Sequence, residues 1–307
     1  MSDLFTATTA AQVEEALTRG QDIEEEQKIV ETNGMFRCFA FTTPLVSAIR
    51  KGRLEVVDCL LKHGVDPKHS PHAGSCPILV ASKEGHASIV ERLIKAGADI
   101  NDNQEGRGST ALIIASQQGS VDVVDCLLSL GADTEAKDWQ GRTALMWACD
   151  RGMIDVVDRL LAAGCGVNAQ DNEGSTALIF AAQRIHVPII DRLVVHGADF
   201  NHQNMRGQNA LMWASQREQV EAVDRLLSLG CDVNIQDEGG WTALMFSCSF
   251  ECFDVVRLLL DHGADPLLCN SDGKKAIDLV PVWSPEIQTL LNGLILLSFH
   301  HHHHHVP

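Results

Sequence analysis

Residues 141–168 read GRTALMWACDRGMIDVVDRLLAAGCGVN, and this stretch decides the fold. Thr143 is suited to begin a helix, because its hydroxyl can accept a hydrogen bond from an unpaired N–H group of the first turn. Gly152 lets the chain reverse into a second helix, and Gly164 lets that helix end in the left-handed conformation. The second helix carries one apolar stripe, made of Val156, Val157, Leu160 and Leu161. The stretch therefore predicts a helix–turn–helix unit.

The same pattern recurs along the chain every 33 or 34 residues. The aligned positions are Thr43, Cys76, Thr110, Thr143, Thr176, Asn209, Thr242 and Lys275. Between units, stretches such as 167–174 carry Asn, Asp and Gly, which predicts hairpin turns. One unit cannot bury its own apolar stripe, whereas stacked units bury it against their neighbours. The sequence predicts an all-α solenoid of stacked helix-turn-helix units with β-hairpin or loop tips.

This pattern resembles the ankyrin repeat family from about residue 42 to residue 291. The matching motifs are Thr43-Pro44-Leu45, Gly85-His86, Val123-Val124-x-x-Leu127-Leu128 and Gly97-Ala98-Asp99-Ile100-Asn101. The histidine of the family's first helix is replaced by apolar residues throughout, at Val46, Leu79, Ile113, Met146, Ile179, Met212 and Met245. The glycine between the helices is lost at Ile185, Glu218 and Glu251. We therefore expect altered or strained interhelical turns in the late repeats.

The repeat register predicts the domain organisation. Residues 1–41 would hold an N-terminal capping helix, at 12–20, and an insertion from residue 22 whose role stays open. The seven repeats would fill residues 42–269, with approximate bounds 42–74, 75–107, 108–140, 141–173, 174–206, 207–239 and 240–269. Residues 270–299 read as a degenerate C-terminal cap that ends in a buried helix. Residues 300–307 are a His-rich tail: an expression tag, a solvated tail or a natural metal-binding tract.

Composition narrows the function classes. Of 307 residues, 45% are apolar, 21% are charged, and the net charge is −17. A chain this acidic is not expected to bind nucleic acid or anionic membranes. Residues 1–10 show neither the basic start nor the apolar core that is typical of a signal peptide, and the apolar run at 290–299 is about half a membrane span. The ten cysteines contain no C-x-x-C motif and read as buried thiols. We expect a monomer in the cytoplasm or nucleus, not a secreted protein.

No catalytic motif of weight is present. The sequence lacks H-E-x-x-H, a Walker loop and G-x-S-x-G. His63, His196 and His262 precede turn glycines, where a cation suits the end of a helix. Recurring acids and arginines of the second helices predict an outer face of weak ion pairs; they are Asp58, Glu91, Asp125, Asp158, Asp191 and Asp224 with Arg92, Arg159, Arg192 and Arg225. The sequence predicts no enzyme, no cofactor and no metal site.

Two series of side chains predict a binding surface. One series ends the first helices and includes Arg151, Arg184 and Arg217. The other lies at the hairpins and comprises Trp139, Arg142, Met205, Arg206 and Trp241. In the family that the chain resembles, partners usually bind the concave side through these regions. Arginine and large apolar side chains are typical anchors of interfaces. The alternative is internal: the arginines pair with acids such as Asp150 and Glu218, and the tryptophans pack on adjacent hairpins.

The first hypothesis is a non-catalytic scaffold or adaptor that binds a protein segment, acidic or phosphorylated, in the concave groove. The alternatives are a targeting or regulatory subunit of an enzyme on another chain, and a repeat module cut from a longer protein.

Trp147, Phe180, Trp213 and Phe246 read as core between repeats rather than as a ligand platform. The resemblance also implies asparaginyl hydroxylation at Asn168 and Asn234, each with a leucine eight residues upstream. Otherwise these asparagines only stabilise their turns.

Overall fold

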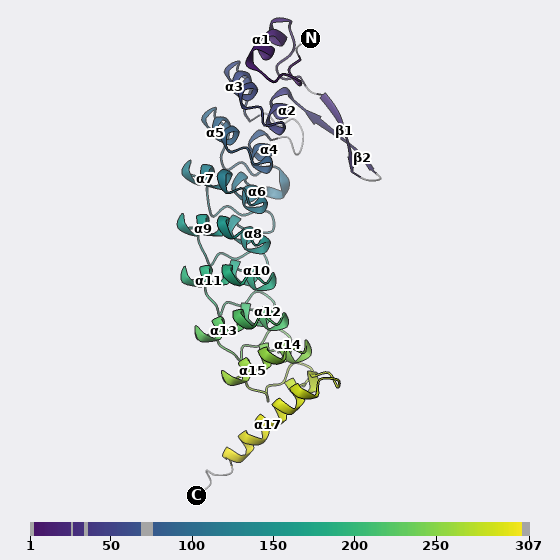
Figure 1. The fold of residues 1–307 in the computed structure, drawn as a ribbon, viewed down its shortest axis with the longest axis vertical. Coiled ribbons are helices and arrows are strands. Elements are labelled where there is room, and N and C mark those ends of the chain that lie inside the picture. The colour runs from purple at the N-terminus through teal and green to yellow at the C-terminus, as the bar shows by residue number, and fades with distance from the viewer. Residues whose placement is uncertain (1–2, 26, 34–35, 69–75, 303–307) are drawn as a thin grey trace. The chain divides into compact units, whose positions relative to one another are not determined.

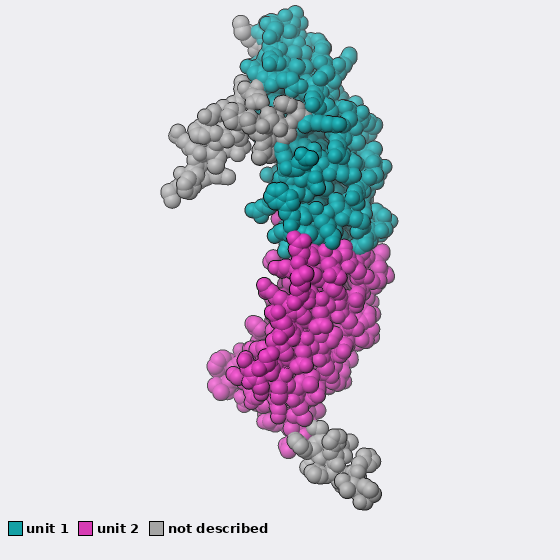
Figure 2. All heavy atoms as spheres, turned by 180° about the vertical axis from the view of Figure 1, so that it is seen from behind, with its two compact units in different colours: residues 1–148, 155–166 teal, residues 149–154, 167–307 magenta. Residues whose placement is uncertain are grey.

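The structure is a computed structural model that describes residues 3–25, 27–33, 36–68 and 76–302, with side chains outside 27–41 and 298–302. Most of the predicted His-rich tail therefore lies outside the described residues. The chain divides into two compact units, coloured separately in Figure 2. Unit 1 comprises residues 1–148 and 155–166, and unit 2 comprises residues 149–154 and 167–307.

Pairs of short helices repeat along both units (Figure 1). The first helices are α2 (Pro44–Arg50), α4 (Pro77–Glu84), α6 (Ala111–Gln118), α8 (Ala144–Arg151), α10 (Ala177–Gln183), α12 (Ala210–Gln216) and α14 (Ala243–Ser249). The second helices are α3 (Leu54–Lys62), α5 (Ala87–Lys95), α7 (Val121–Ser129), α9 (Ile154–Ala162), α11 (Val187–Val195), α13 (Val220–Ser228) and α15 (Phe253–Asp261). Each first helix packs on the first helix of the next repeat: α4 contacts α6 in unit 1, and α10 contacts α12 in unit 2. The predicted stacking of helix-turn-helix units is confirmed.

Most first helices are preceded by a residue whose side chain accepts a hydrogen bond from a backbone amide of the first turn. The hydroxyl of Thr43 accepts a hydrogen bond from the Val46 amide at 3.3 Å. Thr110, Thr143 and Thr242 do the same at 3.3 Å. Asn209 performs this role with its carboxamide oxygen, at 2.9 Å from the Met212 amide. The recurring threonine of the sequence pattern is therefore an N-cap, as predicted.

The apolar stripes of the second helices form the core. In α9, Val157 and Leu160 are fully buried, and Val156 and Leu161 are nearly so. Burying an aliphatic side chain of this size contributes roughly 1.5–3 kcal/mol relative to exposure. Equivalent valines and leucines are buried in α7 and α13. Each stripe has the i, i+1, i+4 spacing that faces one side of a helix.

The chain reverses between paired helices through one residue at positive φ. Gly85, Gly119 and Gly152 hold φ values of 78°, 73° and 71°. Where glycine is absent, Ile185, Glu218 and Glu251 adopt the same left-handed conformation, at 64°, 53° and 58°. A side chain at such φ values costs roughly 1–2 kcal/mol per residue. The predicted strain of the late repeats is therefore present.

The N-terminal end of unit 1 has a helix and a strand pair. Helix α1 (Ala10–Thr18) packs on α3 and overlaps the stretch 12–20 in which the sequence predicted a helix. Strands β1 (Gln27–Asn33) and β2 (Phe36–Thr42) pair antiparallel, with Gln27 opposite Thr42. The insertion whose role the sequence left open thus forms a β-hairpin, which adds strands to the otherwise helical fold.

The C-terminal end of unit 2 differs partly from prediction. It contains α16 (Ala276–Leu279) and α17 (Pro285–His302), which contact α14 and α15 respectively. The expected buried terminal helix is correct only at its start: Ile287 and Leu291 are buried, whereas Leu296 and Leu297 are 62% and 61% exposed. The prediction of burial was wrong for Leu296 and Leu297, which face solvent. No helix in the described ranges is long and apolar enough to cross a bilayer.

Candidate partner-binding surface

The turns between repeats are built on an Asp or Asn that is buried or, at Asp237, half-buried. The carboxylate of Asp138 accepts hydrogen bonds from the amides of Gln140 and Arg142, both at 3.0 Å. The same arrangement, in which one side-chain oxygen accepts from two backbone amides, recurs at Asp171, Asn204, Asp237 and Asn270. Successive turns are joined by backbone bonds, such as Met205 N to Glu173 O at 2.9 Å. This scaffold fixes the side chains that follow each Asp or Asn.

Two of those following side chains are large, apolar and exposed. Trp139 in unit 1 is 71% exposed, and Met205 in unit 2 is 74% exposed. Each also lies on the glycine of the preceding turn: a Cβ atom at Gly108 would lie 2.5 Å from Trp139 Cδ1, and one at Gly174 would lie 3.4 Å from Met205 Cγ. Packing on the adjacent turn therefore fixes these side chains while most of their surface stays in solvent.

Arg142 and Trp241 occupy equivalent positions and make equivalent contacts. The guanidinium of Arg142 lies 4.9 Å from the ring centroid of Trp147, a cation–π contact. The ring of Trp241 lies 5.0 Å from that of Phe246. Trp241 is half-buried rather than fully exposed. Both residues therefore cover an aromatic side chain of the first helix, and this contact restricts what they can offer a partner.

The predicted arginines of unit 2 differ from one another. Arg151, Arg184, Arg206 and Arg217 are all exposed. Arg184 Nε lies 3.0 Å from Asp150 Oδ1, whose side chain is only 14% exposed. Within the described residues, Arg206 and Arg217 make no ion pair, and Glu218 makes none with Arg217. The predicted internal pairing therefore holds for Arg184, and Arg206 and Arg217 present open guanidinium groups.

His186 is a residue that the sequence analysis did not single out. It precedes α11, and its Nε2 lies 3.3 Å from the carbonyl oxygen of Asp150. A Cβ atom at Gly152 would lie 2.6 Å from its ring, so the imidazole packs on that glycine. His86 packs on Gly52 in the same way. The sequence pattern could have identified these two histidines, because both immediately follow an interhelical turn at the same position of the repeat.

The aromatic series of the first helices is only partly core. Phe180 is buried, whereas Trp147, Trp213 and Phe246 are half-buried. Trp147 Nε1 donates to Asp138 Oδ2 at 2.8 Å. The equivalent Trp213 Nε1 is buried without an acceptor. The reason is that Asn204 stands where Trp147 has Asp138, and its second polar atom is an amide donor rather than a carboxylate oxygen.

The outer face of the second helices carries ion pairs, as predicted. They join neighbouring repeats: Arg92 to Asp58 at 3.4 Å, Arg159 to Asp125 at 2.5 Å, and Arg225 to Asp191 at 3.1 Å. Such exposed pairs contribute roughly 0.2–1 kcal/mol each.

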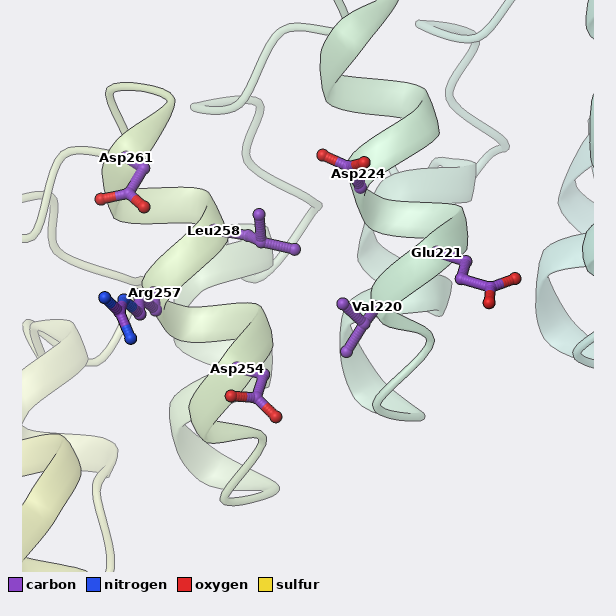
Figure 3. A pocket seen from close by; sticks show the side chains of 7 residues that line it. All are labelled: Val220, Glu221, Asp224, Asp254, Arg257, Leu258 and Asp261. Carbon is purple, nitrogen blue, oxygen red and sulfur yellow. The ribbon is translucent and has the colours of Figure 1, made fainter.

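This series of ion pairs is interrupted between α13 and α15, where Leu258 takes the arginine position. A hollow of about 410 Å³ lies there, lined by Val220, Glu221, Asp224, Asp254, Arg257, Leu258 and Asp261. Figure 3 shows Glu221 and Asp224 on one helix and Asp254, Arg257 and Asp261 on the other. Its lining is mainly the acidic outer face already described.

The buried thiols are held protonated. Burial raises the pKa of Cys76 and Cys165 to about 11, and that of Cys231 and Cys248 to about 12. These groups are therefore poor nucleophiles near neutral pH. The prediction of buried free cysteines is confirmed for them, whereas Cys269 is exposed.

The asparagines predicted as hydroxylation sites bridge turns of unit 2. Asn168 Oδ1 accepts from the Asp199 amide at 2.8 Å, and its Nδ2 donates to Gly197 O at 3.1 Å. Asn234 makes the equivalent bonds to Asp265 and Gly263 at 2.8 and 3.3 Å. Both residues stabilise their turns in the manner of the alternative interpretation. Hydroxylation at either one stays a prediction.

Comparison with known proteins identifies the fold family. A family model described as three copies of the ankyrin repeat matches residues 11–104, 78–171, 145–237 and 178–270. The ankyrin repeat domain of human ASB11 is 25% identical, with a TM-score of 0.62, and the match covers 70% of this chain and 97% of that one. The ankyrin repeat domain of Bcl-3, a member of the IkappaB family, is also 25% identical, with a TM-score of 0.64, covering 72% of this chain and 100% of that one. No curated protein matches this sequence. The chain belongs to the ankyrin-repeat family.

Proposed function

We propose that this chain is a non-catalytic intracellular adaptor that binds an acidic or phosphorylated segment of a partner protein. Ankyrin repeats are in general protein–protein interaction modules. The proposed contact area in unit 2 is the arginine surface, which we define as Arg151, Arg184, Met205, Arg206, Arg217 and Trp241. In unit 1, Trp139 and Arg142 are proposed as further contacts.

The observation that carries the proposal is the exposure of Arg206 and Arg217 without an ion pair among the described residues. In a chain with a net charge of −17, acidic side chains to neutralise them are abundant. A guanidinium can bind a carboxylate or phosphate through two parallel hydrogen bonds. Met205, 74% exposed beside Arg206, supplies the apolar contact that charge alone lacks.

The contacts of the arginines suggest how much each one can contribute to binding a partner. Arg184 already binds Asp150 at 3.0 Å, so a partner must compete with that contact. Arg206 and Arg217 have no such competitor and are the stronger candidates. Arg142 is held over Trp147, which leaves it a smaller share of any binding energy.

The test begins with capture of partners by the full chain and by the variant Arg206→Glu/Arg217→Glu. The captured partner is then titrated with wild type and with each single variant. Each substitution should weaken binding about tenfold or more, because a charge-assisted hydrogen bond contributes roughly 1.5–3 kcal/mol. Circular dichroism checks that the variants remain folded.

Arg257→Glu provides the matched control. Arg257 is exposed and makes no ion pair within the described residues, but it lies on α15 beside the outer hollow. It changes the net charge as much as Arg217→Glu does. Equal losses from both substitutions would mean that only the overall charge matters and would overturn the proposed surface. Dephosphorylation of the partner then separates a phosphorylated from an acidic segment.

A further inference from the structure

The outer ion pairs follow a fixed register that changes at the N-terminal end. The fifth residue of a second helix is acidic and pairs with the sixth residue of the next one, as Asp58 of α3 pairs with Arg92 of α5. Helix α1 has the same register, with Glu14 in the acidic position. Its partner on α3 is Cys59, at the position where α5, α9, α11 and α13 have arginine.

A histidine completes this junction. His63 ends α3, and its Nε2 lies 2.5 Å from Glu14 Oε1. Cys59 Sγ lies 3.7 Å from the same carboxylate oxygen. One ligand atom from each of Glu14, Cys59 and His63 lies within 4.8 Å of the others. Cys59 is 7% exposed, whereas the side chains of His63 and Glu14 are 34% and 54% exposed, so the group is accessible from solvent on one side.

The orientation of His63 differs from that of its equivalents. His196 and His262 occupy the same register, and the Nδ1 atom of each lies 2.9 Å from a carbonyl oxygen of its own helix. These two rings cap their helices. The ring of His63 is instead directed across to α1 and Glu14. The capping role that the sequence suggested for His63 is therefore not its main contact.

The chain holds an internal control for this junction. Between α5 and α7, Cys126 takes the place of Cys59 and Glu91 the place of Glu14. Cys126 Sγ approaches Ala87 O at 3.8 Å, as Cys59 Sγ approaches Ala10 O at 3.9 Å. Leu130 stands where α3 has His63. The packing of two second helices therefore does not require histidine at this position.

We propose that Glu14, Cys59 and His63 bind one divalent transition-metal ion of the zinc class and thereby fasten α1 to α3. Thiolate, imidazole and carboxylate are the ligands that zinc prefers, and a water molecule would complete a tetrahedral set. Bond lengths of about 2.0–2.3 Å place tetrahedral ligands roughly 3.3–3.7 Å apart. The Cys59–Glu14 separation already has this length, and the His63–Glu14 pair opens when the metal ion enters between the two atoms.

The proton balance of binding follows from the state of the three groups. Burial, reinforced by Glu14, raises the pKa of the Cys59 thiol, so the thiol is protonated before metal arrives. The hydrogen bond from His63 lowers the pKa of Glu14, so the carboxylate is charged. The metal ion binds the carboxylate, the thiolate and His63 Nε2. The thiol proton passes to solvent, and the proton that Nε2 donated to Glu14 leaves that atom, so that the neutral ring carries its proton on Nδ1.

The test uses cobalt(II) as a spectroscopic probe of the full chain. His300–His305 are replaced by serine, because a histidine tract binds the same ions, and Cys269→Ser removes an exposed thiol. Titration under reducing conditions should give a thiolate-to-cobalt charge-transfer band that saturates at one equivalent. Added zinc(II) should abolish the band and raise the melting temperature.

Three variants decide the assignment. Cys59→Ser should abolish the band, whereas Cys126→Ser should leave it unchanged. His63→Leu, which copies Leu130, should weaken cobalt binding at least about tenfold and remove the zinc-induced rise in melting temperature. His63 is partly exposed and needed for no core contact, so this variant remains folded. A band that is absent, or that persists unchanged in Cys59→Ser or His63→Leu, overturns the proposal.

Discussion

The interhelical turns fall into two sets that share one backbone conformation. Gly52, Gly85, Gly119 and Gly152 form the glycine turns, and Ile185, Glu218 and Glu251 form the substituted turns. Both sets lie at φ between 53° and 78°. The glycine turns adopt this conformation without strain, whereas each substituted turn holds a side chain in a region costing roughly 1–2 kcal/mol.

The residue that immediately precedes the second helix of the next repeat explains part of the difference. A Cβ atom at Gly52 would lie 2.9 Å from the imidazole of His86, and one at Gly152 would lie 2.6 Å from that of His186, too close in both cases. At Ile185 the corresponding residue is Gln219, which reaches the carbonyl of Ala182 at 2.8 Å instead. At Glu251 the corresponding Ser284 donates a hydrogen bond to the glutamate. The fold therefore requires a left-handed turn between the helices, and a histidine packed on that turn additionally requires glycine there.

Gly152→Ala is expected to have the largest effect. It combines left-handed strain with a Cβ atom 2.6 Å from the His186 ring, and we expect a loss of about 3 kcal/mol in the free energy of unfolding. Urea denaturation measures the loss. Removing the ring with His186→Ser should recover about 1–2 kcal/mol of it in a double-mutant cycle. Strictly additive effects would show that the ring plays no part.

Gly85→Ala separates strain from collision. The nearest atom to the added Cβ is Ser120 Oγ at 3.5 Å, an ordinary contact. The loss should therefore be only about 1–2 kcal/mol, the strain alone. Denaturation under the same conditions as for Gly152→Ala provides the comparison. If Gly85→Ala destabilises the protein as much as Gly152→Ala, the role given to the histidine ring is wrong.

Glycine at a substituted turn should stabilise the protein. Ile185→Gly and Glu218→Gly should each raise the free energy of unfolding by about 1 kcal/mol, somewhat reduced by the greater freedom of glycine in the unfolded chain. Glu251→Gly should gain less, since it loses the hydrogen bond from Ser284. Ile185→Ala is the control: it keeps the strain, so a comparable gain from alanine would contradict the explanation.

Hydrogen exchange in the wild type should show the smallest difference. The amide after a glycine turn, that of His86, bonds to Ala81 O at 3.0 Å, and the amide after a substituted turn, that of Gln219, bonds to Ala214 O at 3.4 Å. We expect several-fold faster exchange at Gln219, because a strained turn opens more readily. Glu218→Gly should narrow the gap. Equal protection of both amides in the wild type would refute the prediction.

The binding surface was only partly predictable from sequence. The register correctly placed Arg184 and Arg217 at the ends of first helices and Met205 at an exposed turn. It could not show that Arg184 binds Asp150 or that Arg142 lies over Trp147, because these contacts depend on side-chain directions. It also treated Trp139 and Trp241 alike, although the first is exposed and the second half-buried against Phe246.

The sequence by itself determined the repeat, its helices, its threonine caps and the strain of the substituted turns. These features depend on local spacing, which a 33-residue period displays directly. Only the tertiary structure decided which side chains meet across repeats. Glu14 and Cys59 are 45 residues apart in sequence and become neighbours only when α1 packs on α3. Residues equivalent in the pattern therefore differ in their contacts, because each one meets the neighbour that its own junction supplies.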